Sequence, residues 1–287
     1  MGMLHDRMEG DLKLRGLSPK TQRCYLSCAR QFAAHYHRSP AEMGEREMTD
    51  FLRHLVQERQ AAAPTIHMYV ASLRFLYKVT LRRPDAVVNL PFPKVPRRIP
   101  EILTGSEVDR LISCITSIKY RTIAAAQYSA GLRISEARHL RPQDIDSARG
   151  VIQIREGKGR KGRQVALSDK LLSMLREYWR IERPQGEWLF PSPKYPTRPV
   201  GEDIVRRALQ KAAQAARLRK KVTLHTMRHC FATHLLELGH DTEVIQHVLG
   251  HASVRTTRRY THVRAEFLRR IRSPFDVIGA KEGEALR

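Results

Sequence analysis

The residues best suited to chemistry in this 287-residue chain lie toward its C-terminal end, where six of the 13 histidines fall between His225 and His251. Two pairs stand four residues apart on expected helices and could each face one ion: His225 with His229, and His247 with His251. Neither pair encloses the glutamate of an HExxH motif, and the carboxylates that hard cations require are sparse across residues 222–262. A metal site is therefore the weaker interpretation of these histidines.

Several of the same residues suit the handling of a phosphate. His225 and Arg228 are three residues apart, so an imidazole and a guanidinium can point from one helical face at the same group. The planar fork of an arginine matches two phosphate oxygens. Further candidates are Arg133, Lys158, His251 and Tyr260. Taken singly, each has an ordinary structural explanation, such as a helix-end salt bridge or a solvated hairpin tip. Only their joint spacing can therefore distinguish a catalytic role from a structural one.

That joint spacing resembles the tyrosine recombinase, or phage integrase, family. Four stretches are similar to the four motif boxes of this family and occur in the same order: GLRISEARHL (131–140), REGKGRKGR (155–163), HTMRHCFATHLLELG (225–239) and LGHASVRTTRRYTHV (249–263). In the N-terminal half, GLSPKTQRCYLSCARQFAAHY (16–36) resembles the first helices of the family's core-binding domain. The resemblance covers nearly the whole chain and implies a site-specific recombinase that cleaves and rejoins duplex DNA.

Carried over position by position, the resemblance implies a complete set of catalytic residues. The two catalytic arginines are Arg133 and Arg228, and the hairpin lysine is Lys158. The histidine of His-x-x-Arg is His225, and His251 fills the position that is His or Trp in the family. The nucleophile is Tyr260. Other members work as a tetramer on two DNA sites and exchange a C-terminal segment, for which Ser273 to Arg287 is the candidate here. A second recombinase or an accessory DNA-bending protein is a further possible partner.

Such a set accounts for strand transfer without a metal, ATP or another cofactor. The transition state spreads negative charge over the phosphate oxygens, where two arginines and a histidine supply fixed positive charge and hydrogen bonds. A tyrosine has a pKa of about 10, so Tyr260 needs a base, for which His225 is the candidate. Lys158, on a glycine-flanked turn, can protonate the leaving 5′-oxygen. The product is a 3′-phosphotyrosyl ester, which a second 5′-hydroxyl can reverse.

The N-terminal part of the chain, which must position this chemistry on DNA, is expected to be helical. Helix starts are indicated at Ser18 with Pro19, at Thr49 and at Pro64, each followed by apolar residues at helical spacing. Four prolines within residues 91–100 then prevent a helix and stiffen the chain. We predict a small helical core-binding domain over 1–90 and a proline-rich linker over 91–103.

The remainder, 104–287, is expected to be a catalytic domain of mixed structure. Thr104 and Glu107 have the spacing of a capping box, and Gly131 is a natural end for a helix over 119–130. Apolar residues flanking the turn of 155–163 predict a short antiparallel hairpin. Further helices are expected over 169–181, 202–217, 226–238 and 241–249. The predicted fold class is mainly α with a small antiparallel sheet, and the resemblance implies two domains that form a C-shaped DNA clamp.

Composition supports a polyanionic partner. The chain has 52 Lys and Arg against 29 Asp and Glu, a net charge of +23 that is spread along the sequence, as contacts to an extended row of phosphates require. Candidate phosphate contacts outside the catalytic set are Arg97, Arg98, Arg160, Lys161, Arg163, Arg219, Lys220 and Lys221. Any one of them is more often a solvated charge.

The expected location is the cytoplasm, in association with the nucleoid. No window approaches the roughly 18 to 20 apolar residues that span a bilayer, and the N-terminus has no apolar signal region. Four scattered cysteines are too few for a disulfide scaffold, so we expect free thiols.

The subtype stays open between several relatives. The N-terminal run, the REGKGRKGR box and the ending IRSPFDVI resemble integron-type integrases, whereas the compact layout resembles Xer-type recombinases. Residues 170–222 lack the insert with which integron integrases hold folded single-stranded sites. We favour a mobile-element recombinase over a chromosome or plasmid dimer resolvase or an integron integrase. A metal-dependent nuclease, a type IB topoisomerase and a non-catalytic DNA-binding protein fit the full residue set less well.

Overall fold

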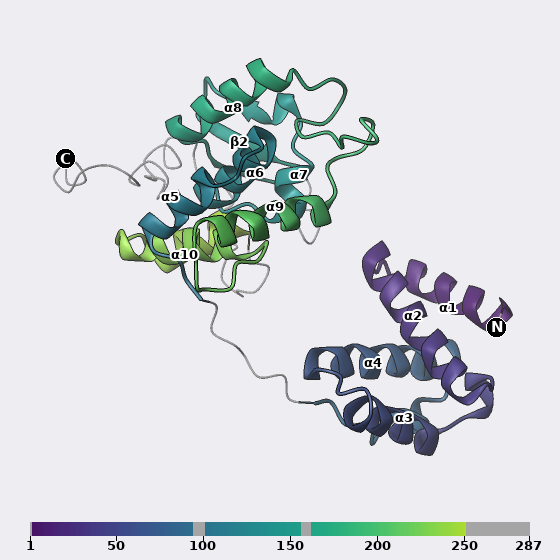
Figure 1. Ribbon diagram of the computed structural model, residues 1–287. Helices are drawn as coiled ribbons and strands as arrows, with labels where there is room; N and C mark the ends of the chain where they lie inside the picture. The colour runs from purple at the N-terminus through teal and green to yellow at the C-terminus, as the bar shows by residue number, and fades with distance from the viewer. Residues whose placement is uncertain (1, 94–100, 156–161, 251–287) are drawn as a thin grey trace. The chain divides into compact units, whose positions relative to one another are not determined.

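The structure is a computed structural model that describes residues 2–93, 101–155 and 162–250 (Figure 1). The chain divides into two compact units, Met1–Arg98 and Ile99–Arg287. Within the described ranges, no helix combines the length and the apolar content that crossing a membrane requires.

The described part of the first unit is helical throughout. Its elements are α1 (Gly2–Leu14), α2 (Pro19–Tyr36), α3 (Glu45–Gln57) and α4 (Ala63–Phe75), a wide turn at Leu76–Thr80 that continues α4, and short 3-10 turns at Pro40–Glu42 and Pro84–Val87. Ser18 caps α2 as predicted, because its hydroxyl accepts the backbone N–H of Thr21 at 3.2 Å. The core packs around two fully buried rings, Phe32 of α2 and Tyr77 of the wide turn.

Two features of this unit differ from the sequence-based expectation. The helix expected to start at Thr49 begins four residues earlier, because the Glu47 carboxylate accepts the backbone N–H of Gly44 at 2.9 Å and so closes the first turn of α3. Helix α1 was also not predicted from the sequence. Only Met8 and Leu12 of that helix are buried, which leaves too few apolar residues to reveal its periodicity.

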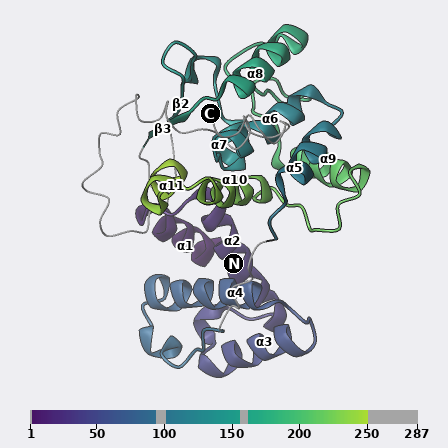
Figure 2. The same cartoon turned by 90° about the vertical axis from the view of Figure 1, so that its left-hand side faces the viewer.

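The second unit surrounds one buried helix. Its helices are α5 (Gly105–Ser113), α6 (Ile118–Ser129), α7 (Ile134–Arg138), α8 (Asp169–Glu182), α9 (Glu202–Ala215), α10 (Thr226–Glu237) and α11 (Thr242–Leu249), with a 3-10 turn at Pro142–Asp144. Every residue of α6 from Thr122 to Ser129 is buried. In both ribbon views α6 lies between α8 and α10, and it packs against each of them (Figure 1, Figure 2). The surfaces formed by α8 and by α10 are therefore separate and flank one core helix, α6.

The sheet consists of three short antiparallel strands, β1 (Ile145–Asp146), β2 (Val151–Ile154) and β3 (Arg163–Ala166). The predicted hairpin is confirmed, with Ile152 opposite Val165 and Ile154 opposite Arg163. The third strand, β1, adds one further ladder that the sequence did not indicate. The predicted fold class, mainly helical with a small antiparallel sheet, is confirmed.

The segment that precedes α5 is attached to α10 through Leu103. Its backbone N–H donates to the Cys230 sulfur at 3.3 Å, and its carbonyl oxygen lies 2.9 Å from Nε2 of His234. Because a carbonyl can only accept, Nε2 carries the proton and Nδ1 accepts from the Tyr128 hydroxyl at 2.7 Å. This chain of buried hydrogen bonds joins α6, α10 and the start of the unit. The capping box predicted at Thr104 is confirmed directly after it.

Gly131, between α6 and α7, stands where the helix predicted over 119–130 was expected to end. Its φ is +62°, a left-handed value that favours glycine, and α10 and α11 approach its backbone closely. A Cβ at this position would lie 2.5 Å from Cε1 of Phe231 and 2.9 Å from a Leu249 methyl carbon. Glycine is thus required here by both conformation and space.

We predict that Gly131→Ala lowers the free energy of unfolding of the second unit by about 2 to 4 kcal/mol, the sum of overpacking and left-handed strain. Gly239→Ala is the matched control, because Gly239 has a φ of +82° but nothing within 4 Å of its would-be Cβ. Both tryptophans lie in the second unit, so urea unfolding followed by tryptophan fluorescence reports on it. Equal losses in the two variants would contradict the steric argument.

Candidate active site

Glu136 lies in the first turn of α7 with a side chain that is only 3% exposed, and it binds several arginine groups. Arg163, the first residue of β3, donates from both terminal nitrogens to the two carboxylate oxygens at 2.8 and 2.9 Å. Arg133 donates its side chain at 2.7 Å and its backbone N–H at 2.8 Å. A terminal nitrogen of Arg228, on α10, lies 3.8 Å away. One carboxylate thus brings together arginines from three elements.

The same three arginines also bind the C-terminal end of α11. Three consecutive carbonyl oxygens each accept a hydrogen bond from a different guanidinium: Val248 from Arg163 at 2.9 Å, Leu249 from Arg228 at 2.5 Å and Gly250 from Arg133 at 3.1 Å. The last carbonyls of a helix lack partners within it and form the negative end of its dipole. The arginines satisfy these groups and fix the end of α11 against α7, β3 and α10.

Electrostatics keep Glu136 ionised. Burial by itself would raise the pKa of this carboxyl, but the hydrogen bonds and positive charge of Arg163, with the bonds from Arg133, outweigh burial and hold the pKa at about 2. Arg228 shows the opposite effect: burial, and then the neighbouring Arg133, lower its pKa to about 10. That value is still well above neutral pH, so Arg228 stays charged when Glu136 is charged.

The arrangement retains an excess of positive charge, because three guanidinium groups surround one carboxylate. Their accessibility differs: the side chain of Arg133 is 21% exposed, against 10% for Arg163 and 7% for Arg228. Arg133 is therefore the arginine of the cluster that is most accessible to an incoming anion. Such fixed positive charge can stabilise negative charge that develops on a phosphate during a reaction.

Three of the six predicted catalytic residues lie in the described ranges. Arg133 and Arg228, far apart in sequence, come together at Glu136, and Arg228 also donates to the Gly131 carbonyl at 2.6 Å. His225 is exposed and directly precedes the first turn of α10, the turn that carries Arg228. The other predicted residues that lie outside the described ranges are Lys158, His251 and Tyr260, the tentative DNA contacts Arg97, Arg98, Arg160 and Lys161, and the exchange segment Ser273 to Arg287.

The charges of two of the tentative DNA contacts are paired inside the unit. Arg163 is bound to Glu136 and to α11, as described above. The Lys220 ammonium group donates to the Glu107 carboxylate at 2.7 Å and to the Ile102 carbonyl at 2.9 Å. Arg219 and Lys221 are exposed and remain candidate contacts.

Glu136 was assigned no role from the sequence, although a signal was present. Glu136 is three residues beyond Arg133, and Arg133 is the N-cap of α7, so the pair has the spacing of a capping box. The buried position of Glu136 and its arginine partners result from tertiary packing, which the capping-box spacing does not reveal.

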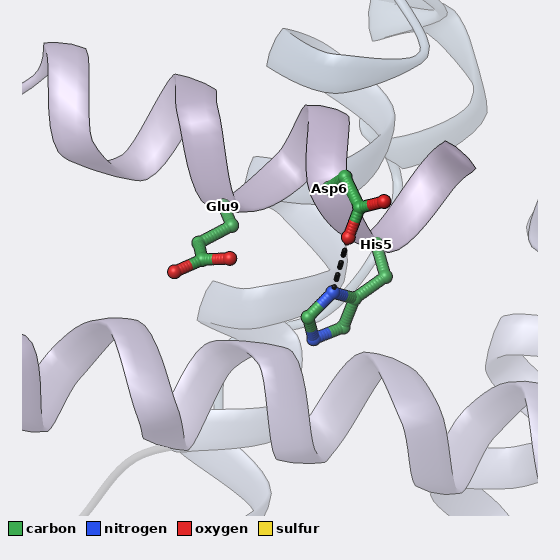
Figure 3. Close-up of side chains that lie close together, drawn as sticks. All are labelled: His5, Asp6 and Glu9. Atoms are coloured by element: carbon green, nitrogen blue, oxygen red, sulfur yellow. Dashed lines mark hydrogen bonds and ion pairs between the residues drawn. The ribbon is translucent and has the colours of Figure 1, made fainter. Parts of the chain in front are cut away.

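Potential metal ligands also come together among the described residues. Figure 3 shows the one group of three that comes together there, His5, Asp6 and Glu9 on α1. Glu9 is paired with the Lys13 ammonium group at 2.6 Å, and Asp6 is largely exposed, so this group resembles an ordinary solvated helix face. The ring centroids of His225 and His229 are 6.3 Å apart, and no carboxylate among the described residues joins them in such a group.

Comparisons with known proteins agree on one family. Residues 101–266 match the model of the phage integrase family, and residues 4–85 match that of the phage integrase N-terminal SAM-like domain. The protein y4qK of Sinorhizobium fredii, which carries an integrase/recombinase name, is 42% identical over 279 residues, 97% of this chain and 90% of that protein. The tyrosine recombinase XerA of Thermococcus kodakarensis is 35% identical and covers 97% of both chains.

Among solved structures, the chain is similar to a lambda integrase fragment crystallised as a dimer bound to a COC' core site. The TM-score is 0.71 over 87% of this chain and 94% of that one. At 20% sequence identity, this likeness concerns the fold alone.

We predict that Glu136→Gln destabilises the second unit by about 3 to 5 kcal/mol at pH 7, because it removes the buried negative charge that three arginines surround. The folded-state pKa of about 2 lies below the ordinary 4.5, so this stabilisation is present above pH 4.5 and is lost as the pH falls toward 2. The difference between wild type and Glu136→Gln should therefore shrink over that interval.

Urea unfolding at a series of pH values, followed by tryptophan fluorescence, measures this difference. Glu177→Gln, at an exposed carboxyl of α8, is the control and should follow the wild type throughout. A difference for Glu136→Gln that stays constant between pH 7 and pH 3 would show that Glu136 is not the ionised centre of the cluster.

Proposed function

This chain belongs to the phage integrase family, and from that premise we propose that Tyr260 attacks a DNA phosphodiester held at the arginine cluster around Glu136. The protein is a tyrosine recombinase, an enzyme of site-specific DNA recombination. The observation that carries the proposal is the meeting of Arg133 and Arg228 at one site with an excess of positive charge.

The proposed reaction is a reversible transfer of one phosphodiester bond. The Tyr260 oxygen forms a bond to phosphorus, and its proton passes to His225 as the base. The bond from phosphorus to the 5′-oxygen breaks, and Lys158 protonates that oxygen as it leaves. The 3′-phosphotyrosyl ester is then attacked by the 5′-hydroxyl of a second strand, which releases Tyr260. Arg133, Arg228 and His251 stabilise the charge on the equatorial oxygens in both steps.

The geometry supports this proposal because the positive charge is fixed in place by the protein itself. Glu136 and the α11 carbonyls orient the guanidinium groups, so little reorganisation is needed when a phosphate enters. Gly250, whose carbonyl accepts from Arg133, directly precedes His251 in the sequence.

We place the substrate among duplex DNA sites of a mobile element. Residues 170–222 are fully described, and between α8 and α9 they contain a connection without a helix, with no inserted element of the kind expected for folded single-stranded sites. The lambda integrase structure holds DNA at a core site, and its fold is shared here. The alternatives are dimer resolution of the Xer type and cassette recombination of the integron type. Some relatives carry an integrase name and others a Xer name.

The expected partners follow from the same proposal. Strand exchange between two sites requires four active sites, so we propose a homotetramer on DNA, with residues 273–287 as the exchanged segment. Three further expectations remain predictions: a partner recombinase or DNA-bending protein, a cytoplasmic, nucleoid-associated location, and a clamp formed by the two units.

We predict that Tyr260→Phe abolishes the covalent protein–DNA adduct while DNA binding is retained, because only the attacking oxygen is removed. The wild-type protein should form an SDS-resistant adduct on a nicked suicide substrate carrying its cognate site, in the presence of EDTA. Tyr195→Phe, at an exposed tyrosine in the connection before α9, is the matched control and should form the adduct normally. An adduct formed by Tyr260→Phe would assign the nucleophile elsewhere, and loss of the wild-type adduct in EDTA would favour a metal-dependent nuclease.

We predict that the double variant Arg219→Gln, Lys221→Gln weakens binding to all DNA sequences and flattens its salt dependence. Each lost phosphate contact reduces the slope of log K against log salt by about 0.9. Lys220→Gln is the control, because Lys220 is paired with Glu107 and should change stability rather than the slope. Titrations monitored by fluorescence anisotropy at several salt concentrations measure the slope, and an unchanged value in the double variant would remove both residues from the interface.

A further inference from the structure

The second unit has an open groove along α8, away from the arginine cluster around Glu136. Its volume is about 760 Å³, within the range of sites that bind small ligands or peptide side chains. The groove is lined by α8 itself, by Pro142 before β1 and Ile145 in β1, and by residues after α8 that include Pro184 and Leu189. We call this the α8 groove.

Apolar side chains of α8 line part of the groove. Leu172, Leu175 and Trp179 line it at helical spacing. Trp179 is 43% exposed, and the neighbouring Ile181, beyond the lining, is 62% exposed. An exposed tryptophan beside other apolar groups is unusual on a free surface and typical of a contact that becomes buried on binding.

The charged residues of the α8 groove are all positive. Arg176, Arg180 and Arg183 line it, and no aspartate or glutamate does. Within the described ranges, none of these three side chains is in an ion pair, whereas Arg141 nearby is paired with Glu187 at 2.6 Å. Three unpaired guanidinium groups beside an apolar surface are complementary to carboxylates that flank an apolar side chain.

We propose that the α8 groove binds an acidic, amphipathic peptide segment of a partner protein. An apolar side chain of that segment packs on Trp179 and Leu175, and carboxylates on either side of it pair with Arg176, Arg180 and Arg183. The apolar lining favours a peptide over duplex DNA, because the outer surface of a duplex is dominated by charged phosphates. Tryptophan and arginine are also the residue types that dominate binding energy at protein interfaces.

The position of the groove in the fold lets such a partner bind without displacing a substrate. Helix α6 lies between α8 and α10, and Arg228 is on α10 (Figure 1). A segment seated on α8 is therefore separated from the arginine cluster by the buried core helix. The inference concerns recruitment or control of the enzyme and does not depend on which residue is the nucleophile.

The two tryptophans of the chain make the groove directly observable. In the full-length variant Trp188→Phe, Trp179 is the sole tryptophan and its fluorescence reports on the groove. The probe is a short synthetic peptide in which leucines alternate with glutamates. We expect a saturable change in Trp179 fluorescence with a micromolar Kd that weakens as salt is added.

Three controls give this test its specificity. A peptide with serine for leucine and a peptide with lysine for glutamate should each bind at least tenfold more weakly. The charge reversal Arg180→Glu should weaken binding of the acidic peptide at least tenfold, whereas Arg207→Glu, at an exposed arginine of α9, should not. All variants should form the covalent adduct on suicide DNA as the wild type does, which separates this proposal from the proposed reaction.

Other outcomes would overturn the proposal. If the acidic peptide gives no saturable change, or if Arg180→Glu and Arg207→Glu affect it equally, the groove is not a site for acidic segments. If duplex DNA changes Trp179 fluorescence and Arg180→Glu weakens DNA binding, the arginines of α8 are DNA contacts. If a synthetic peptide of residues 273–287 binds the groove more tightly than the acidic probe, the occupant is the chain's own C-terminal segment.

Discussion

The bonding of three arginines to one buried carboxylate is the interaction on which the catalytic unit depends. Guanidinium groups placed this close together repel one another, and burial makes each charge costlier. Glu136 offsets part of this cost with a full negative charge, and the end of α11 offsets more with three carbonyl dipoles. The cluster can therefore be assembled during folding and keep a positive excess, so the protein does not need a phosphate to hold its arginines in place.

The surrounding fold is arranged so that these partners can meet. Arg133, Arg163 and Arg228 come from a helix start, a strand start and a helix turn, and each must approach the end of α11 closely. Gly131 permits that approach, because any side chain there would collide with Phe231 and Leu249. The hydrogen bonds that Leu103 donates to Cys230 and accepts from His234 attach α10 to the segment before α5. Local backbone chemistry and long-range packing thus serve the same few contacts.

Local signals in the sequence predicted much of the fold, and tertiary contacts account for most of what they missed. Ser18 and Thr104 act through neighbours a few residues away, so their caps could be read from spacing alone. The start of α3 depends on Glu47 binding back to Gly44, and Thr49 was a competing signal of the same kind. Arg163 looked like a surface cation because its partner, Glu136, is 27 residues away. For Arg163, residue type fixed the charge, but only the fold determined its partner.

The same reasoning divides the large positive charge of this chain into different uses. Around Glu136, every arginine is bonded to groups of its own unit, which fixes its direction and makes it suited to stabilising one developing charge. Along α8, the arginines have no ion-pair partner among the described residues and stand beside an exposed tryptophan. Unpaired charges are free to reorient, which is poor for catalysis but suitable for docking a flexible segment. Because α6 separates the two surfaces, one unit can bind on one face while it reacts on the other.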